Sequence, residues 1–466
     1  MPQYLSPGVY VEEVPSAVKA IAGVGTSTAG FIGVVGNKLT SPLYTVTNET
    51  PVPATDPKEF LLSVYPVVET AGTFEVRVNG KIDATAKLDN DDPNKRGKVI
   101  FTAAPAAGAS ISVDYMYEFT PVDAGVVKLC TTFSDYKKFF GDFSADAGHR
   151  KLTHAVYGFF NNGGTRCYVM RVATEDDLPK FLVKFEAIDE IAVVAAPGLI
   201  AANTRSALVI HCQTKTQDRF AILDSDETIE DADHNLDLIQ LARGGSKVPP
   251  DSDYAAFYVP WIQVFDPVEK LTKKNDGLVF VPPSGHLAGI YARVDTERGV
   301  FKAPANEPVL GALGLKYRIS KAQQDGLNPH GVNCIRDLNG NLTVWGARTV
   351  GGDANADLKY INVRRTLLFL RESIDEGTQW VVFEPNTPAL WQKITRNVTA
   401  FLTGVWRSGA LFGTTEQEAF FVKCDAENNP PEQRELGQVV TEIGVAIVRP
   451  AEFVIFRISQ FSAPGK

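Results

Sequence analysis

Residues that could perform catalysis are present, but their spacing does not match the motifs of the common catalytic classes. Ser134 and Lys137 have the S-x-x-K spacing of a serine nucleophile with a lysine base, but the S-D-N and K-T-G partner motifs are missing. The G-x-S-x-G and H-E-x-x-H motifs are also absent, and the six histidines are scattered singly. A pair of carboxylates for glycoside hydrolysis has no comparable motif, so the sequence leaves that chemistry open.

Three short segments contain residue types that bind ions, and each departs from the pattern that the ion requires. Asp231, Asp233 and Asn235 begin like a calcium loop, but its sixth and twelfth positions are leucine and alanine instead of glycine and glutamate. The acidic run at residues 224–227 fits a solvated turn better than a metal site. The glycines within residues 30–36 match neither the Walker motif nor G-x-G-x-x-G. We therefore predict no metal, no cofactor and no enzymatic activity.

The composition limits the possible partners. The 466 residues include 46 Lys and Arg against 55 Asp and Glu, and the resulting charge of −9 disfavours nonspecific binding to nucleic acid. Apolar runs stay well short of the ~18 residues of a membrane-spanning helix, and the N-terminus lacks the features of a secretory signal. The five cysteines lie far apart, so we predict no disulfide framework, no zinc site, and a reducing compartment during folding.

Hydrophobic periodicity predicts a mixture of helices and strands. The alternating segments FEVRVNGKI, KVIFTA and ISVDYMY, with a turn at Asn79-Gly80, predict a small all-β insertion. Between residues 175 and 285, the apolar runs IAVVAAP, ALVIHC, RFAILD, YAAFYVPWIQV and GLVFVPP predict strands of a parallel sheet. Amphipathic helices are predicted at about residues 358–373 and from Thr387-Pro388 to about residue 407.

These patterns predict a multidomain α+β or α/β protein whose core combines N- and C-terminal segments. The predicted parts are an N-terminal arm at 1–20, a discontinuous core at 21–40, 121–174 and 286–448, a β-rich insertion at 41–120, an α/β domain at 175–285, and a C-terminal arm at 449–466.

Both ends of the chain have the pattern of extended β arms. Pro2, Pro7 and Pro15 punctuate an N-terminal segment in which valines alternate with other residues. Near the other end, Pro450 precedes a second apolar stretch, and proline delimits a pairing segment because it cannot donate to a ladder. Such an arm either pairs within its own domain or adds a strand to a sheet edge of another chain. Together with the missing catalytic motifs, the arms favour a structural role.

Six segments resemble the tail sheath proteins of contractile phage tails and related injection systems. They occur in the order typical of that family, whereas residues 41–120 have no recognisable counterpart. The segments are LSPGVYVEEV at 5–14 with the following AGVGTSTAGFIGVV, LTHAVYGFFNNGGTRCYVMRV at 152–172, SGHLAGIYARVDTERGVFKAPAN at 284–306, VWGARTV at 344–350, KYINVRRTLLFLRESI at 359–374, and EIGVAIVRPAEFVIFRISQ at 442–460.

The resemblance implies a structural subunit of hexameric rings that stack helically around an inner tube and contract to drive the tube through a target envelope. It also implies that neighbouring copies are joined by their arms. The implied partners are further copies of the chain, the tube protein, baseplate and terminal cap proteins, and paralogous sheath proteins, with no nucleic acid and no membrane insertion. Assembly in the bacterial cytoplasm, as part of a phage tail or a released tail-like particle, is the implied location.

Specific residues follow from this interpretation. The residues expected to pair between subunits are Tyr4, Val9, Tyr10, Val11, Glu12 and Val14 in the N-terminal arm, and Phe453, Val454, Ile455, Phe456, Arg457 and Ile458 in the C-terminal arm. For the tube contact we predict Lys393 and Arg396, with Arg364 and Arg365 as alternatives; an ordinary solvated helix face fits the same pattern. The competing function is a β-rich carbohydrate-active or receptor-binding surface protein.

Overall fold

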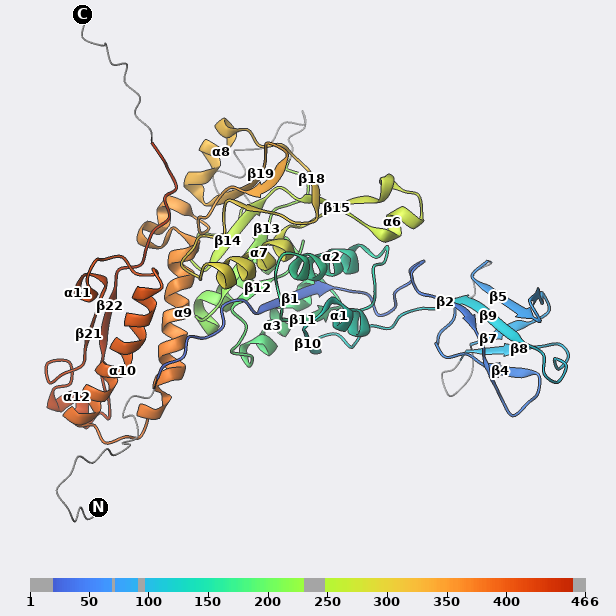
Figure 1. The fold of residues 1–466 in the computed structure, drawn as a ribbon, viewed down its shortest axis with the longest axis horizontal. Coiled ribbons are helices and arrows are strands. Elements are labelled where there is room, and N and C mark those ends of the chain that lie inside the picture. The colour runs from blue at the N-terminus through green and yellow to red at the C-terminus, as the bar shows by residue number, and fades with distance from the viewer. Residues whose placement is uncertain (1–19, 69–71, 91–96, 230–247, 456–466) are drawn as a thin grey trace, which may run out of the picture. The chain divides into compact units, whose positions relative to one another are not determined.

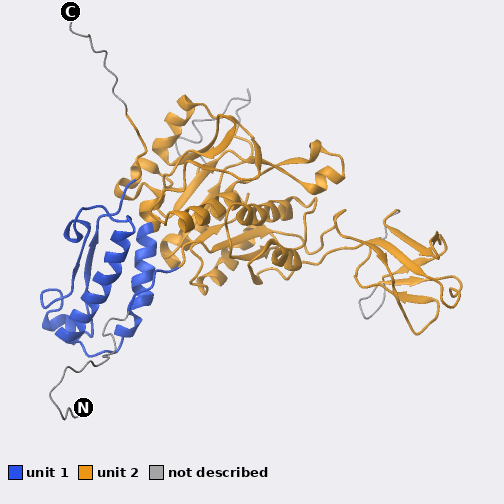
Figure 2. Cartoon of the chain, in the orientation of Figure 1, with its two compact units in different colours: residues 1–24, 366–449 blue, residues 25–365, 450–466 orange. Residues whose placement is uncertain are grey.

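The computed structural model describes residues 20–68, 72–90, 97–229 and 248–455, and these residues form several sheets and many helices (Figure 1). The mixed α/β class predicted from the sequence is therefore confirmed. The chain divides into two compact units, coloured separately in Figure 2. Unit 1 comprises residues 1–24 and 366–449, and unit 2 comprises residues 25–365 and 450–466.

Unit 2 is built on a nine-stranded sheet. Its five inner pairings, from β11 through β1, β12, β13 and β14 to β19, are all parallel, and β10, β20 and β17 add antiparallel edges. The order is β10 (Val127–Cys130), β11 (Cys167–Val172), β1 (Ala29–Val34), β12 (Val193–Ala195), β13 (Phe220–Asp224), β14 (Ala255–Val259), β19 (Val332–Leu338), β20 (Asn341–Val344) and β17 (Glu307–Pro308). Every residue of β12, β13 and β14 is buried, as expected for parallel strands covered on both faces.

This sheet differs from the predicted division of the chain. We placed boundaries at residues 174 and 285, but β11 and β12, on either side of the first boundary, both pair with β1. On either side of the second boundary, β14 and β19 also pair directly. The predicted core and the predicted α/β domain therefore share one sheet in unit 2, and residues 175–285 are not a separate body.

Helices cover the sheet and connect its strands. In unit 2 they are α1 (Phe133–Phe140), α2 (Ala147–Asn161), α3 (Leu178–Glu186), α4 (Ala202–Ile210), the π-helix η2 (His211–Thr216), α6 (Pro267–Leu271), α7 (Ser284–Glu297) and α8 (Lys321–Leu327). Short 3₁₀ segments are η1 (Glu175–Asp177), η3 (Asn275–Gly277), η4 (Asn328–His330) and η5 (Gly352–Leu358). The run ALVIHC, predicted to be a strand, lies in α4 and η2 and was assigned wrongly.

Two glycines of β1 let helices approach both faces of the sheet. A Cβ atom at Gly30 would lie 2.8 Å from the ring of Phe185 on α3, and one at Gly33 would lie 2.8 Å from the side chain of Leu152 on α2. Positions an odd number of residues apart point to opposite faces of a strand, so α3 and α2 cover opposite faces. These glycines serve close packing in β1.

Residues 45–116 form two small antiparallel sheets. One has the order β2 (Thr45–Glu49), β9 (Ile111–Met116), β5 (Phe74–Val78) and β6 (Lys81–Ile82); the other has β3 (Val52–Pro53), β4 (Glu59–Leu61), β8 (Lys98–Ile100) and β7 (Lys87–Asp89). The hairpin predicted at Asn79-Gly80 is confirmed: it joins β5 to β6, and both residues have positive φ, as a type I′ turn requires. A shared cluster that includes Val76, Val99 and Val113 forms their core.

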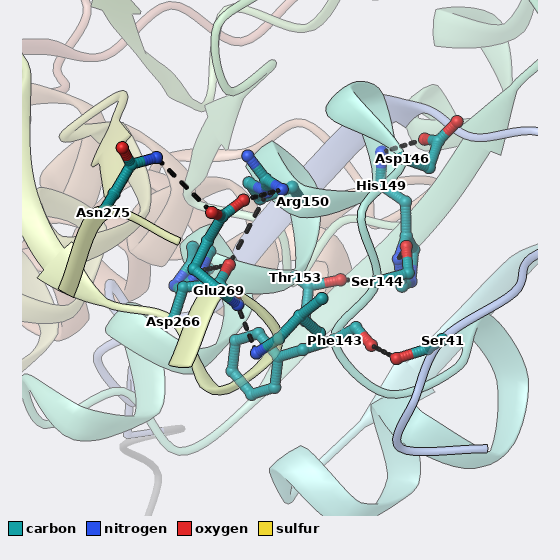
Figure 3. A network of polar contacts seen from close by, with 12 residues as sticks. Ser41, Phe143, Ser144, Asp146, His149, Arg150, Thr153, Asp266, Glu269 and Asn275 are labelled. Atoms are coloured by element: carbon teal, nitrogen blue, oxygen red, sulfur yellow. Dashed lines mark hydrogen bonds and ion pairs between the residues drawn. The ribbon is translucent and has the colours of Figure 1, made fainter. Parts of the chain in front are cut away.

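A third antiparallel sheet in unit 2 has the order β16 (Leu278–Val281), β15 (Ile262–Phe265) and β18 (Ala312–Leu315). Helix α6 lies in the connection between β15 and β16, and Figure 3 shows residues of α6 and α2 in a network of polar contacts. Asp146 caps α2 by accepting from the backbone N–H of His149, and Asp266 caps α6 in the same way. Arg150 joins the two helices, because its Nη2 lies 2.7 Å from Oε1 of Glu269.

Unit 1 is mainly helical. It contains most of α9 (Ile361–Thr378), then η6 (Gln379–Val381), α10 (Pro388–Arg407), α11 (Glu416–Ala419) and α12 (Pro431–Glu435), with the two-stranded sheet of β21 (Phe420–Lys423) and β22 (Glu442–Val445). The predicted amphipathic helix is confirmed: α10 begins at Pro388 and buries Leu390, Ile394 and Val398.

Candidate assembly surfaces

At two places, side chains of the types that perform catalysis form contacts within the fold. Ser134 and Lys137 lie on α1, and the ammonium of Lys137 is 3.2 Å from a carboxylate oxygen of Asp142. His154 and Asp266 meet at 3.0 Å, like the base and orienting acid of a catalytic triad, but their side chains are only 2% and 0% exposed. A pair so deeply buried connects α2 to α6 and offers no surface to a substrate.

The acidic run at residues 224–227 is not the solvated turn that we predicted. Asp224 is buried at the end of β13, and its carboxylate accepts from the backbone N–H of Gly198 and from the N–H and hydroxyl of Ser284. Burial raises the pKa of Asp224 to about 6, against the opposing effect of these donors. Among the described residues, no three His, Cys, Asp or Glu side chains gather as a metal site would require. The segment with Asp231, Asp233 and Asn235, which departs from the calcium-loop pattern, lies outside the described residues.

Three histidines, His149, His211 and His286, are buried without a carboxylate at hydrogen-bond distance, and we call them the buried histidines. Burial disfavours the charged imidazolium, so it lowers the pKa of His149 and His211 to about 4 and that of His286 to about 3. All three are therefore neutral at pH 7, and they make the fold sensitive to acid.

The start of the predicted C-terminal arm is held by a group of residues that we call the Glu452 anchor: Glu452, Arg348, Asn328 and Tyr360. The guanidinium of Arg348 donates to both carboxylate oxygens of Glu452, at 2.8 Å from Nε and 2.7 Å from Nη2. The Asn328 amide and the Tyr360 hydroxyl donate to the same carboxylate at 2.7 and 3.0 Å. Burial opposes ionisation of Glu452, but these donors outweigh it, and the pKa of Glu452 is lowered. The anchor is therefore ionised at neutral pH.

Immediately beyond the anchor, apolar side chains are exposed. Phe453, Val454 and Ile455 have exposed fractions of 70%, 68% and 77%, and none of them lies in a strand or helix. The remaining C-terminal arm residues, Phe456, Arg457 and Ile458, lie outside the described residues. So do residues 1–19 of the predicted N-terminal arm, which include Tyr4, Val9, Tyr10, Val11, Glu12 and Val14.

In unit 1, the sheet of β21 and β22 has two strands among the described residues, so each strand leaves one edge without a strand partner. The strands pair over four residues each, from Phe420 opposite Val445 to Lys423 opposite Glu442. Backbone groups on such an edge are able to accept a further strand from another chain. Phe421 on β21 is 52% exposed and could contact such a strand.

The predicted tube-contact residues fall into two groups. Lys393 and Arg396 are exposed on α10, opposite its buried side, and within the described part of the chain neither forms an ion pair. Arg365 is only 3% exposed, and its guanidinium donates to both carboxylate oxygens of Asp295, at 2.9 and 2.6 Å. Arg364 pairs with Asp253, and its side chain is 12% exposed. Arg364 and Arg365 thus hold unit 2 together and are not available as the alternative contacts.

The described residues thus form a mixed α/β fold with an exposed apolar segment at residues 453–455 and a two-stranded sheet in unit 1. Two solved structures share this fold over nearly the whole chain. The first is the baseplate of the anti-feeding prophage (AFP), with a TM-score of 0.64 and 24% sequence identity; the match covers 98% of this chain and 100% of that chain. The second is the contracted sheath complex of the extracellular contractile injection system PVC, with a TM-score of 0.65 and 23% sequence identity; the match covers 99% of each chain.

Sequence comparison defines the family. Residues 171–350 match the central domain of phage tail sheath proteins, and residues 353–461 match the phage tail sheath C-terminal domain. The chain belongs to the phage tail sheath family. It is 26% identical over 206 residues to a prophage major tail sheath protein of Pseudomonas aeruginosa, covering 43% of this chain and 49% of that protein. It is also 27% identical over 195 residues to the tail sheath protein of Vibrio phage KVP40, a match that covers 41% of this chain and 28% of that protein. The matches therefore span half or less of these curated relatives.

Sequence reasoning predicted a C-terminal arm but did not identify the residues that anchor its start. Arg348 and Glu452 are 104 residues apart, and nothing in the local pattern of either connects them. One available signal was a single acidic residue within the apolar stretch after Pro450, where an unpaired charge would be costly to bury.

The described helices, considered separately, lack the combination of length and apolar character that crossing a bilayer would demand.

Proposed function

We propose that the chain is the structural subunit of a contractile sheath. Hexameric rings of the chain stack helically around an inner tube, and the stack contracts to drive the tube through a target envelope. The partners are further copies of the chain, the tube protein, baseplate and terminal cap proteins, and paralogous sheath subunits where they exist. The family assignment and the likeness to the AFP and PVC structures support this function over a carbohydrate-active or receptor-binding protein.

The observation that carries the proposal is the C-terminal segment, which is fixed at Glu452 and apolar immediately beyond it. Exposed apolar residues gain free energy when another surface covers them. In the assembled sheath, residues 453–459 add a strand to a neighbouring copy, and the N-terminal arm does the same. The open edges of β21 and β22 are the acceptors that the geometry favours.

The contact with the tube is polar. Lys393 and Arg396 on α10 face an acidic surface of the tube. Each exposed ion pair is worth only about 0–1 kcal/mol, so many copies hold the extended sheath while each single contact releases easily. The energy for contraction is stored during assembly as a difference between two packings of the same subunits, without nucleotide hydrolysis. Assembly takes place in the bacterial cytoplasm, and the finished particle is a phage tail or a released tail-like device.

Negative-stain microscopy of three forms of the purified chain tests the proposal. The full chain should form hollow, striated cylinders. A chain that ends after Glu452 keeps the anchor but lacks the donor strand, and it should remain folded and unassembled. A chain that ends after Ser459 keeps the donor strand and serves as the matched control, so it should assemble. A full chain that never forms rings or filaments would refute the proposal, as would equal assembly of all three forms.

A further inference from the structure

Two of the five cysteines face each other across an edge of the large sheet. Cys130 and Cys167 are directly opposite in the antiparallel pairing of β10 with β11, and both are free thiols with 0% exposure. Opposite residues of such a pair point to the same face, with Cβ atoms about 4.5–5.5 Å apart. The thiols are close enough to hydrogen-bond, since this contact contributes, after burial, to raising the pKa of Cys167. The sequence concealed this pair, because its members are 37 residues apart.

The backbone geometry suits a covalent bond. Opposite residues in an antiparallel pair have Cα atoms about 4.5 or 5.5 Å apart, depending on whether they exchange hydrogen bonds. Both values lie within the roughly 4.4–6.8 Å range of disulfides, so the strands need not separate or shift register. The other cysteines differ: Cys334 lies opposite Val259, Cys212 lies in the π-helix, and Cys424 follows β21.

The surroundings give the pair a route to an oxidant. Helix α1 covers it, and Tyr136 of α1 lies near both thiols, which add to the effect of burial in raising the pKa of Tyr136. Among the strands that the structure describes, however, β10 is a four-residue edge strand with a partner on one side only. Edge strands with few cross-strand bonds open locally at lower cost than central strands. Opening of β10 would therefore expose both thiols together.

We propose that Cys130 and Cys167 form a reversible cross-strand disulfide when the protein meets a low-molecular-weight disulfide such as oxidised glutathione. One thiol loses its proton and attacks the small disulfide, releasing one reduced thiol and leaving a mixed disulfide on the chain. The second cysteine thiolate attacks the protein sulfur of that mixed disulfide and releases the other small thiol. Two protein thiols are thereby oxidised, one small disulfide is reduced to two thiols, and the bond fixes β10 to β11.

The new bond would close a loop that contains α1 and α2, both of which lie between the two cysteines in the sequence. It would also fix β10, the first strand of the large sheet that follows the two small β-sheets in the sequence. Cross-links of this kind restrict the unfolded chain and resist opening of the linked strands. The oxidised protein should therefore unfold at a higher temperature than the reduced protein.

Thiol counting and peptide mapping after equilibration with reduced and oxidised glutathione test the proposal on the full chain. Starting from either redox state, the oxidised buffer should give three titratable thiols per denatured chain instead of five. A peptide linking Cys130 to Cys167 should appear, together with a gain in unfolding temperature that dithiothreitol reverses. Cys130→Ala and Cys167→Ala should each abolish the linked peptide and the gain, whereas Cys334→Ala should leave both intact.

Several outcomes would overturn the proposal. Five thiols at equilibrium from both directions would show that the fold disfavours the bond. Linked peptides that involve Cys212, Cys334 or Cys424 would show that oxidation is not selective. If an alanine variant fails to fold, wild-type mapping still decides, because it depends on neither substitution.

Discussion

The Glu452 anchor gives the sharpest prediction, since one substitution should loosen the C-terminal segment without altering its sequence beyond that point. In Glu452→Gln the side chain keeps its size and one carbonyl oxygen. The other oxygen becomes an NH₂ group facing the guanidinium of Arg348, which has only donors to offer. The Arg348 side chain is 4% exposed, so solvent does little to replace the lost contact.

The size of the effect follows from the contacts. Hydrogen bonds that involve a charged group contribute about 1.5–3 kcal/mol each, and the substitution disrupts at least one of the two from Arg348. Asp353, whose carboxylate lies 3.0 Å from Nη1 of Arg348, still compensates part of the buried charge. We therefore expect a loss of about 2–3 kcal/mol, which raises the population of the detached segment roughly 30- to 150-fold.

A nitroxide on a cysteine introduced at Ala451 would measure this detachment. Ala451 is exposed and adjacent to Glu452, whereas the five native cysteines are buried, so labelling is selective under native conditions. In the unassembled wild-type chain the spectrum should be immobilised at pH 5, because the pKa of Glu452 is lowered and the carboxylate stays ionised. A depressed carboxyl pKa contributes stability that is lost only as pH falls through the folded-state value. In Glu452→Gln, the label should be mobile at every pH.

The matched control is Glu297→Gln, which makes the same chemical change at an exposed position on α7. It should leave the spectrum unchanged. Equal mobility of wild type and Glu452→Gln at neutral pH would refute the argument, because the bidentate contact would then contribute nothing to holding the segment.

Three further predictions follow from other parts of the fold. Reversing Lys393 and Arg396 to glutamate should reduce recovery of tube-loaded, extended particles in co-assembly while leaving the unfolding temperature unchanged, and normal loading would remove α10 from the tube contact. Gly289→Ala should destabilise unit 2 by about 1–3 kcal/mol in urea unfolding, since its Cβ would lie 2.4 Å from a backbone oxygen of α2; an unchanged midpoint would show that α7 shifts freely. Below pH 6.5 each of the buried histidines should lower the free energy of unfolding by about 1.4 kcal/mol per pH unit, because the unfolded chain binds the protons. Among the described carboxyl groups, Asp224 alone has a raised pKa, and it opposes this loss below about pH 6. Urea midpoints that stay constant from pH 7 to 5 would contradict it.

Sequence reasoning succeeded where local chemistry determines structure. Asn79 and Gly80 both adopt positive φ at the turn between the paired strands β5 and β6. Proline at the first helical position correctly placed the start of α10. In each case the residue type restricts its own backbone, so the prediction needs no knowledge of distant contacts.

Reasoning from apolar runs alone failed at ALVIHC. A short apolar run does not distinguish a buried strand from a buried helix. The topology resolves it: β12 and β13 are adjacent and parallel, and a connection between such strands must cross the sheet, which a helix usually does. Treating the run as a crossover between two predicted parallel strands would have identified α4. The anchor had no comparable rule, because the contact between Arg348 and Glu452 depends on the whole fold of unit 2.

The proposed arm works because its root and its tip are stabilised by different forces. The bidentate contact at Glu452 fixes a direction, since a guanidinium and a carboxylate pair in one plane, but it gains nothing from a neighbouring chain. The exposed side chains from Phe453 to Ile455 fix no direction, but they gain free energy when a neighbouring chain covers them. Covering each gains about 1.5–3 kcal/mol, and ordering its backbone costs about 1–2 kcal/mol, so one arm gains only a few kcal/mol. Single pairs of subunits should therefore bind weakly, and stability must come from many arms engaged at once in a closed ring.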